Sequence, residues 1–179
     1  AKAGVSRVHT LTPDGLGSLT DAVDAASPIP RAVPRGRDDL AAILYTSGTT
    51  GRSKGAMLTH GNLASNAQVL TQYWHFTDQD VLIHALPIFH THGLFGATKG
   101  ALVAGASLIY HTRFDAAAIL TDFARATTLM GVPTFYTRLL DMPELTKEST
   151  AGIRLFISGS APLLAETHVQ WQQRTGKAI

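Results

Sequence analysis

One segment of this sequence combines the residue types that bind phosphate groups. It runs from Tyr45 to Gly55 and reads YTSGTTGRSKG. Gly48 and Gly51 can adopt positive φ angles, so successive backbone N–H groups can converge on an anion. Four hydroxyl side chains between residues 46 and 50 add donors, and Lys54 adds a positive charge. The segment therefore indicates a phosphate-binding loop.

The spacing of this loop differs from that of P-loop nucleotide triphosphatases. Their motif has four residues between the glycines, then Lys followed at once by Ser or Thr, and then a helix. Here two residues separate Gly48 from Gly51, and Lys54 is followed by Gly55. The apolar run over 55–58 has the character of a strand. The sequence therefore argues against a P-loop and predicts a loop between two strands.

A second candidate segment is rich in histidine. Residues 86–94 read LPIFHTHGL, and His84 lies just before them. The three histidines His84, His90 and His92 could form a metal site, but a His-x-His pattern with no cysteine or carboxylate nearby is weak evidence for zinc. His90 could also be a hydrogen-bonded residue beneath a loop, and the sequence leaves these alternatives open.

A third segment, 155–163, reads LFISGSAPL and follows a strand-like run. Open α/β sheets bind ligands at the carboxyl ends of their strands, which is where this segment is expected. It is not the Gly-x-Ser-x-Gly elbow of a hydrolase, because Ala161 and Pro162 follow Ser160. Taken alone, it could be a strand-to-helix turn with Pro162 at the first helical position.

These three segments together resemble the acyl-adenylate-forming, or AMP-binding, enzymes, which comprise acyl-CoA synthetases, firefly luciferase and peptide-synthetase adenylation domains. Ser53 stands where many members have proline. The resemblance implies that His90 borders the pocket for the acid substrate. It implies that the ATP phosphates are bound by Thr46, Ser47, Gly48, Thr49, Thr50, Gly51 and Lys54. It implies that the adenine is bordered by Ser158, Gly159, Ser160, Ala161 and Pro162.

The segment 130–140, MGVPTFYTRLL, is similar to malonyl-CoA synthetases within this family. The resemblance implies that Arg138 and Ser160 hold the distal carboxylate of malonate, a task suited to the planar fork of arginine. The alternative is that Arg138 pairs with Asp141 or Glu144 on a helix surface. A ligase for another short acid, such as a monocarboxylate, is then the competing interpretation.

The resemblance implies ATP-dependent activation of malonate, or of a similar small dicarboxylate, and transfer of the acyl group to CoA. ATP, Mg²⁺ and CoA are then the expected cofactor and co-substrates. The family's further AMP- and magnesium-contacting residues and its adenylation lysine would lie beyond Ile179. No metal ligand is therefore expected in this chain, which would be inactive alone or a non-catalytic nucleotide-binding fragment. Its remaining partner would be the rest of the parent polypeptide.

Composition narrows the classes of function. The chain has 179 residues, 45% hydrophobic and 16% charged, with a formal charge of +2. This balance argues against a disordered chain and gives no reason to expect a nucleic-acid partner. No apolar run is long enough to span or anchor in a membrane. The absence of cysteine fits a reducing compartment, and with no signal-like segment a cytoplasmic location is expected.

Alternating strand-like and helix-like segments predict an α/β fold: a mostly parallel sheet with flanking helices, forming part of the family's N-terminal domain. Residues 1–39 are expected to end a preceding subdomain, with a strand at 5–11 and a Pro/Arg-rich linker at 27–39. Residues 40–179 would form a partial AMP-binding subdomain, with the C-terminal domain absent. Strands are expected at 40–45, 81–85, 106–110, 128–131 and 154–158. Helices are expected at 60–74, 93–103, 115–125, 133–141 and 162–175.

Overall fold

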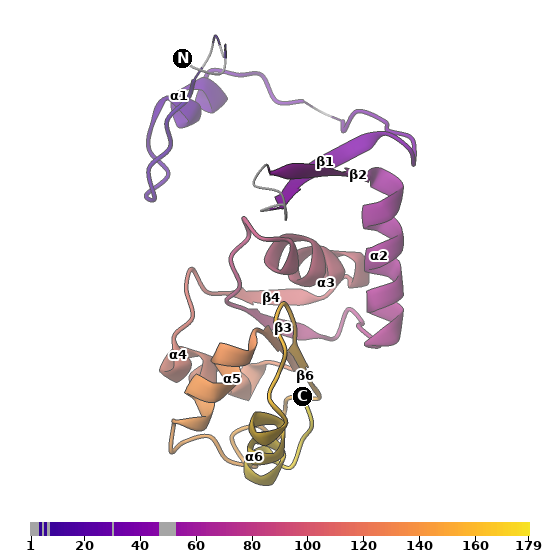
Figure 1. Cartoon of the computed structure of the whole chain (residues 1–179). Coiled ribbons are helices and arrows are strands. Elements are labelled where there is room, and N and C mark those ends of the chain that lie inside the picture. The colour runs from indigo at the N-terminus through magenta and orange to yellow at the C-terminus, as the bar shows by residue number, and fades with distance from the viewer. Residues whose placement is uncertain (1–3, 5, 7, 30, 47–52) are drawn as a thin grey trace. The chain divides into compact units, whose positions relative to one another are not determined.

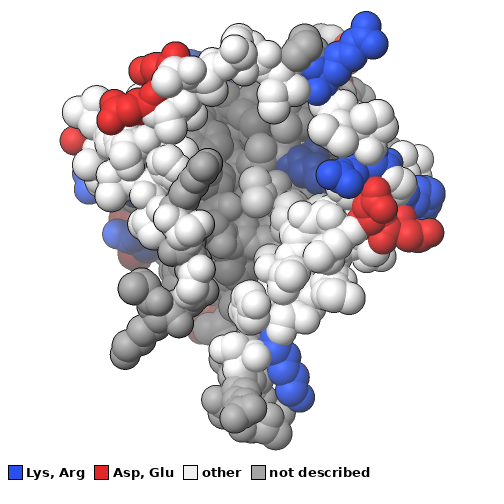
Figure 2. Space-filling view, turned by 90° about the horizontal axis from the view of Figure 1, so that it is seen from above, with Lys and Arg blue, Asp and Glu red and all other residues white. Residues whose placement is uncertain are grey.

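The computed structural model describes residues 4, 6, 8–29, 31–46 and 53–179. It divides into two compact units, residues 1–35 and residues 36–179, which are considered separately. No helix in the described part of the chain is long and apolar enough to cross a membrane. Charged side chains of both signs are scattered among uncharged residues on the face shown in Figure 2, and in places the two signs adjoin.

The first unit contains the short helix α1 (Ser18–Asp24), which the sequence analysis did not predict. The strand expected at 5–11 is wrong, because the described residues there, 6 and 8–11, form no strand. The backbone of Thr10 instead bonds to the start of α1: its N–H donates to Ser18 Oγ, and its carbonyl accepts from the N–H of Leu19. Alternating polarity makes a strand when a partner strand is available, and here the polar groups are satisfied locally.

The second unit begins with an antiparallel hairpin, β1 (Leu40–Thr46) and β2 (Lys54–Thr59). Thr46 pairs with Lys54, so both strands run up to the loop that joins them. This confirms the strands on either side of the phosphate loop. Helix α2 (His60–Tyr73) then begins at a capping box, in which Thr59 and Asn62 each bond the other's backbone N–H.

The centre of the second unit is a four-stranded parallel sheet in the order β4-β3-β5-β6. Its strands are β3 (Val81–His84), β4 (Ser107–Tyr110), β5 (Thr128–Gly131) and β6 (Leu155–Ser158). The parallel sheet and flanking helices confirm the predicted α/β class. Because crossovers between parallel strands are right-handed, the reversal of strand order after β4 places helices on both faces.

The helices that cover the sheet are shown in Figure 1, with α2 and α3 on one side and α4, α5 and α6 on the other. The π-helix η1 (His92–Thr98) runs directly into α3 (Lys99–Ala104), where a single helix was expected at 93–103. Asp115 caps α4 (Ala116–Asp122), which ends in the 3₁₀ turn Phe123–Arg125. The last two helices are α5 (Pro133–Leu140) and α6 (Ala165–Thr175).

The core below β5 and β6 is aromatic. Trp171 of α6 meets Tyr136 of α5 and Phe156 of β6 edge to face, with ring centroids 5.0 and 4.8 Å apart. Trp171 and Tyr136 are fully buried, and the Tyr136 hydroxyl donates to the carbonyl of Ile157. These contacts fix α5 and α6 against the strand whose end carries the third candidate segment.

A buried carboxylate, Asp80, joins the starts of the strands. Arg154 Nε donates to Asp80 Oδ1 at 2.8 Å and Nη2 to Oδ2 at 2.7 Å, while Thr127 Oγ1 donates to Oδ1 at 2.7 Å. Burial alone would raise the pKa of Asp80, but the hydrogen bonds from Arg154, Thr127 and the backbone of Thr77 outweigh it and lower the pKa to about 2. Asp80 is therefore ionised and fully paired.

We predict that Arg154→Met lowers the free energy of unfolding by about 3–5 kcal/mol at pH 7, because it leaves the buried Asp80 charge unpaired. Since the folded-state pKa lies below the ordinary value of 3.8, the pair contributes stability above about pH 4 and loses it as the pH falls toward 2. The difference in free energy of unfolding between variant and wild type, measured by urea unfolding, should therefore become smaller as the pH falls from about 4 to 2.

The control is Arg125→Met. Arg125 pairs with Asp122, but its side chain is 69% exposed, so the expected loss is about 1 kcal/mol or less. Equal losses in the two variants, or a difference for Arg154→Met that stays constant down to pH 2, would contradict the role given to Asp80.

Candidate functional site

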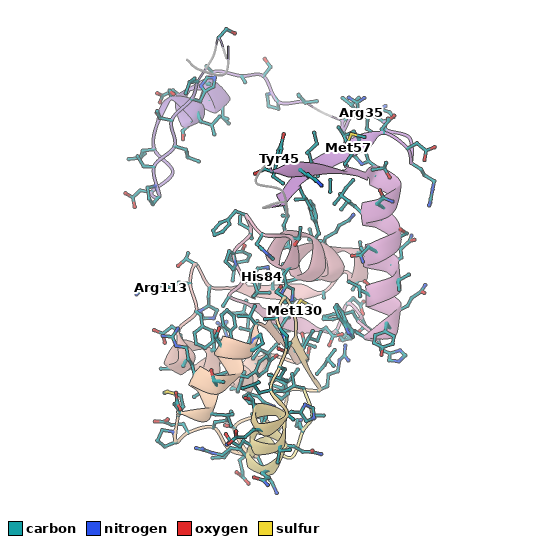
Figure 3. All side chains as sticks on the ribbon, in the orientation of Figure 1. Arg35, Tyr45, Met57, His84, Arg113 and Met130 are labelled. Atoms are coloured by element: carbon teal, nitrogen blue, oxygen red, sulfur yellow. The ribbon has the colours of Figure 1, made fainter. Side chains whose placement is uncertain are left out.

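The candidate site lies at the carboxyl ends of the central strands. His84 ends β3, Gly131 ends β5 and Ser158 ends β6, and the register pairs Gly131 with Ser158. Figure 3 shows His84 beside Met130, its partner on β5. The segments that follow these strand ends are the second and third candidate segments and the start of α5. The parallel sheet therefore brings them together at one edge, as expected for an α/β ligand site.

Three hollows open at this edge. Cavity A, of about 310 Å³, is lined by Leu86, Pro87, Phe89, His90, His92, Gly93, Val132, Phe135 and Ser160. Cavity B, of about 710 Å³, extends from Ser158–Ser160 and His92 to Leu58 and α2. Cavity C, of about 490 Å³, shares Phe89 and Phe135 with cavity A and continues past Phe114. The edge can thus hold a ligand with several parts.

The predicted phosphate loop is partly described. The backbone of Thr46 ends β1, and Lys54 begins β2 with its side chain exposed. The predicted binding residues Ser47, Gly48, Thr49, Thr50 and Gly51 lie outside the described residues. The role of the loop therefore stays a prediction, although the strands on both sides of it agree with the expected context.

The segment after β6 makes an unusual turn. Gly159 N–H donates to the carbonyl of Gly131 at 3.1 Å, and Ser160 then adopts φ 68°, in the left-handed region that non-glycine residues rarely occupy. Ser158 Oγ is buried and has no hydrogen-bond partner within the described part of the chain. Ala161 and Pro162 are exposed.

Pro162 does not begin a helix, which corrects the prediction of a helix from 162. Helix α6 starts at Ala165, after Leu164 in an extended conformation. The left-handed residue at 160 redirects the chain, and residues 161–164 remain outside the helix. This leaves a short exposed stretch beside the cavities, where the resemblance predicts contact with the adenine.

The three histidines differ in position. His84 is fully buried, and its Nε2 lies 2.8 Å from the carbonyl oxygen of Gly93 and 3.0 Å from Thr98 Oγ1. His90 is exposed and lines cavity A; its Nδ1 accepts from the backbone N–H of His92 at 3.2 Å. No group of three His, Cys, Asp or Glu residues that could hold a metal occurs among the described residues.

Gly93 makes this arrangement possible. A Cβ at this position would lie 2.2 Å from the carbonyl oxygen of Pro87, so a side chain would push the start of η1 away from the loop. The Gly93 carbonyl also accepts from Thr98 Oγ1 at 2.9 Å, in addition to its contact with His84. The side chains of His84 and Thr98 thus both contact the Gly93 carbonyl oxygen. They hold the start of η1, next to His92, in place.

His92 is a site residue that the sequence analysis considered only as a possible metal ligand, and the family resemblance gave it no role. Its Nδ1 lies 2.9 Å from Ser160 Oγ, and it lines both cavity A and cavity B. Burial lowers the pKa of His92, and the charges of His90 and His84 would lower it further, so the imidazole is neutral at pH 7. The only sequence signal for a role of His92 was its position two residues after His90. Its contact with Ser160 joins residues 68 positions apart, which no local pattern predicts.

Arg138 lies on the exposed face of α5, and the structure does not bring it into contact with Ser160. Its guanidinium carbon is 5.2 Å from the centroid of the Phe114 ring, which stacks on Phe135 at 4.1 Å. Within the described residues Arg138 has no ion pair, so the alternative of pairing with Asp141 or Glu144 is not realised. The guanidinium thus packs on Phe114, a residue that lines cavity C, and has no carboxylate partner in this part of the chain.

The chain is similar to proteins of known activity. It is 37% identical over 155 residues to a feruloyl-CoA synthase of an Amycolatopsis species, covering 85% of this chain and 31% of that protein. It is 34% identical over 162 residues to a malonate–CoA ligase of Arabidopsis thaliana, covering 79% and 27%.

Solved structures agree with the sequence comparisons. The crystal structure of ATP-bound MatB from Rhodopseudomonas palustris superimposes with a TM-score of 0.93 at 64% identity, covering 99% of this chain and 35% of that one. The chain thus spans about a third of the length of these relatives. The family model described as AMP-binding enzyme matches residues 3–179. Because this match covers nearly the whole chain, the chain belongs to the AMP-binding enzyme family.

Proposed function

We propose that this chain is part of an acid–CoA ligase that activates malonate, or a similar small dicarboxylate. The observation that carries the proposal is cavity A, which joins His90 and Ser160, from the segments attributed to the acid and the adenine, in one space of about 310 Å³. Such a volume has room for a small acid. The similarity to malonate–CoA ligases and to MatB supports the same class of reaction.

The proposed reaction has two steps. A carboxylate oxygen of the acid attacks the α-phosphorus of ATP, which forms an acyl-adenylate and releases pyrophosphate. The thiol of CoA then attacks the acyl carbon, which forms the thioester and releases AMP. Negative charge moves onto the leaving pyrophosphate in the first step, so donors fixed around the β- and γ-phosphates stabilise it.

We assign the pyrophosphate-binding role to the loop between β1 and β2, with Lys54 as its cation. The antiparallel hairpin supports this role because it holds the two ends of the loop together at the pair Thr46 and Lys54. The described residues contain no group suited to binding a metal. We therefore propose that Mg²⁺ enters bound to the phosphates of ATP, as is common for this ion.

The preference for a dicarboxylate is assigned to Arg138 and Ser160. A cation that lies over an aromatic ring, without a carboxylate partner in the described part of the chain, is available to an anionic ligand. The Phe114 ring that Arg138 covers lines cavity C, and cavity C shares Phe89 and Phe135 with cavity A, where Ser160 lies. Arg138 itself lines neither cavity, so the proposal requires its side chain to turn toward the bound acid.

We also propose that the partners are small molecules and the rest of a longer polypeptide. The chain spans about a third of its relatives' length, which supports the second part of this proposal. A cytoplasmic location is proposed from the absence of cysteine.

The activity is tested by ATP–pyrophosphate exchange with malonate. The full-length ligase should catalyse exchange, and the isolated 179-residue chain should not, because positioning and charge stabilisation by the rest of the protein are required. Lack of exchange by the full-length protein with malonate would contradict the proposed substrate. Exchange by the purified 179-residue chain would contradict the need for the remaining parts.

We predict that Lys54→Ala in the full-length ligase lowers kcat/KM for ATP by about 10- to 100-fold, since a hydrogen bond to a charged group contributes about 1.5–3 kcal/mol. Steady-state kinetics with varied ATP measure the effect. The control is Lys147→Ala, which removes an exposed lysine away from the site. Similar values for the two variants would remove Lys54 from the phosphate-binding role.

We predict that Arg138→Met lowers kcat/KM for malonate by about 30-fold or more, and lowers it much less for butyrate. Removing one partner of a desolvated charge pair costs about 2–5 kcal/mol, and butyrate has no distal charge to lose. Competition between the two acids in the same assay measures the ratio.

Two controls accompany Arg138→Met. Arg138→Lys keeps the charge but loses the planar fork, so it should retain part of the preference for malonate. Ser160→Ala should act in the same direction with a smaller effect, because it removes one neutral donor. Equal losses for malonate and butyrate in Arg138→Met would assign the arginine to the helix surface.

A further inference from the structure

The two residues that cavities A and B have in common are His92 and Ser160. They come from different elements, the start of η1 and the turn after β6, and their side chains meet at 2.9 Å. The hydrogen-bonded pair therefore separates cavity A, which we assign to the acid, from cavity B. A group in this position contacts whatever occupies either cavity.

The backbone at Ser160 supports a role for its side chain. A φ of 68° is unfavourable for a residue with a Cβ, and glycine would adopt it freely. Strained backbone of this kind is concentrated at ligand sites, where the surrounding structure holds it. At Ser160 the contact that holds the side chain is the one to His92 Nδ1. The pair thus fixes the hydroxyl at the edge of cavity A.

The direction of this hydrogen bond determines what Ser160 can bind. If the hydroxyl donates to His92 Nδ1, its oxygen lone pairs remain for the ligand, and these repel a carboxylate. If Nδ1 carries the proton and donates to Ser160 Oγ, the hydroxyl hydrogen is free to donate to a carboxylate. A neutral imidazole can be either donor or acceptor at Nδ1, depending on its tautomer.

We propose that His92 is a positioning residue for acid selection: in its Nδ1–H tautomer it donates to Ser160 Oγ and turns the serine hydroxyl toward the distal carboxylate of the substrate in cavity A. This inference rests on the proposed function, because it takes a dicarboxylate as the ligand. His92 itself does not touch the reacting atoms. Its backbone N–H donates to His90 Nδ1, so the same residue also orients the second histidine of the pocket.

The test uses two variants of the full-length ligase with opposite hydrogen-bonding properties. His92→Asn keeps an N–H group at a position equivalent to Nδ1, whereas His92→Leu fills similar space without a donor. We expect His92→Leu to lower the ratio of kcat/KM for malonate to that for butyrate by about 10-fold, the effect of one lost hydrogen bond to a charged ligand. His92→Asn should restore at least part of this ratio.

A double-mutant cycle separates positioning from packing. In a Ser160→Ala background, His92→Leu should cause little further loss of the ratio, because the hydroxyl that His92 orients is gone. Thermal unfolding of each variant shows whether the fold is kept. A merely structural role would instead lower activity with both acids alike, and the variants with leucine and asparagine would behave in the same way.

The outcomes distinguish this inference from the proposed function. If the wild-type ligase does not activate malonate, the proposed function is wrong and the inference fails with it. If the wild type activates malonate but His92→Leu leaves the ratio unchanged, or the losses in the double variant add, the inference alone is overturned. A lower ratio of kcat/KM for malonate to that for butyrate in His92→Leu, with at least partial recovery of the ratio in His92→Asn, supports the inference.

Discussion

The structure of the second unit depends on one ionised carboxylate. Asp80 precedes β3, and its side chain binds Thr127 before β5 and Arg154 before β6. Its backbone carbonyl accepts from the N–H of Ser107, the first residue of β4. Arg154 also donates to the carbonyls of Trp74 and His75 after α2. The buried charge of Asp80 is tolerated because Arg154 and the hydrogen-bond donors are present together, and removing Arg154 would leave that charge uncompensated.

This network matters for the site because the strands are short. Each has four residues, and the register set at the amino edge decides which residues emerge at the carboxyl edge. A slip of one residue would turn His84 out of the core and replace Gly131 with a residue that has a side chain. A Cβ at Gly131 would lie 2.8 Å from the Phe135 ring. Cavity A therefore exists because the opposite edge of the sheet is fixed.

Local patterns predicted most of the second unit because each strand is a short apolar run followed by a helix with recognisable end signals. Asp115 and Pro133 stand at helix starts, and Gly105 and Gly176 stand at helix ends with positive φ. The strand expected at 5–11 failed because polarity does not reveal whether a partner strand exists. The start of α6 was misplaced because nothing local signals the left-handed conformation of Ser160.

The candidate site was predictable to the extent that its residues lie in continuous motifs. The contact of His92 with Ser160 depends on the sheet bringing distant segments together, and no spacing rule gives it. Similarly, the sequence could not decide whether Arg138 pairs with a neighbouring carboxylate or packs on Phe114, because Phe114 comes from the segment between β4 and α4. The roles of Ser158 to Pro162 and of the phosphate loop remain predictions.

The Asp80 network lies at the amino ends of the four-residue strands and cavity A lies at their carboxyl ends, and this separation has a consequence for how the family diversifies. Substitutions around cavity A can alter acid preference without disturbing the charge that keeps the strands in register. Two relatives of this chain bear the names feruloyl-CoA synthase and malonate–CoA ligase, which denote chemically different acids. A fold with stability and selectivity at opposite edges lets evolution exchange one substrate for another on an unchanged scaffold.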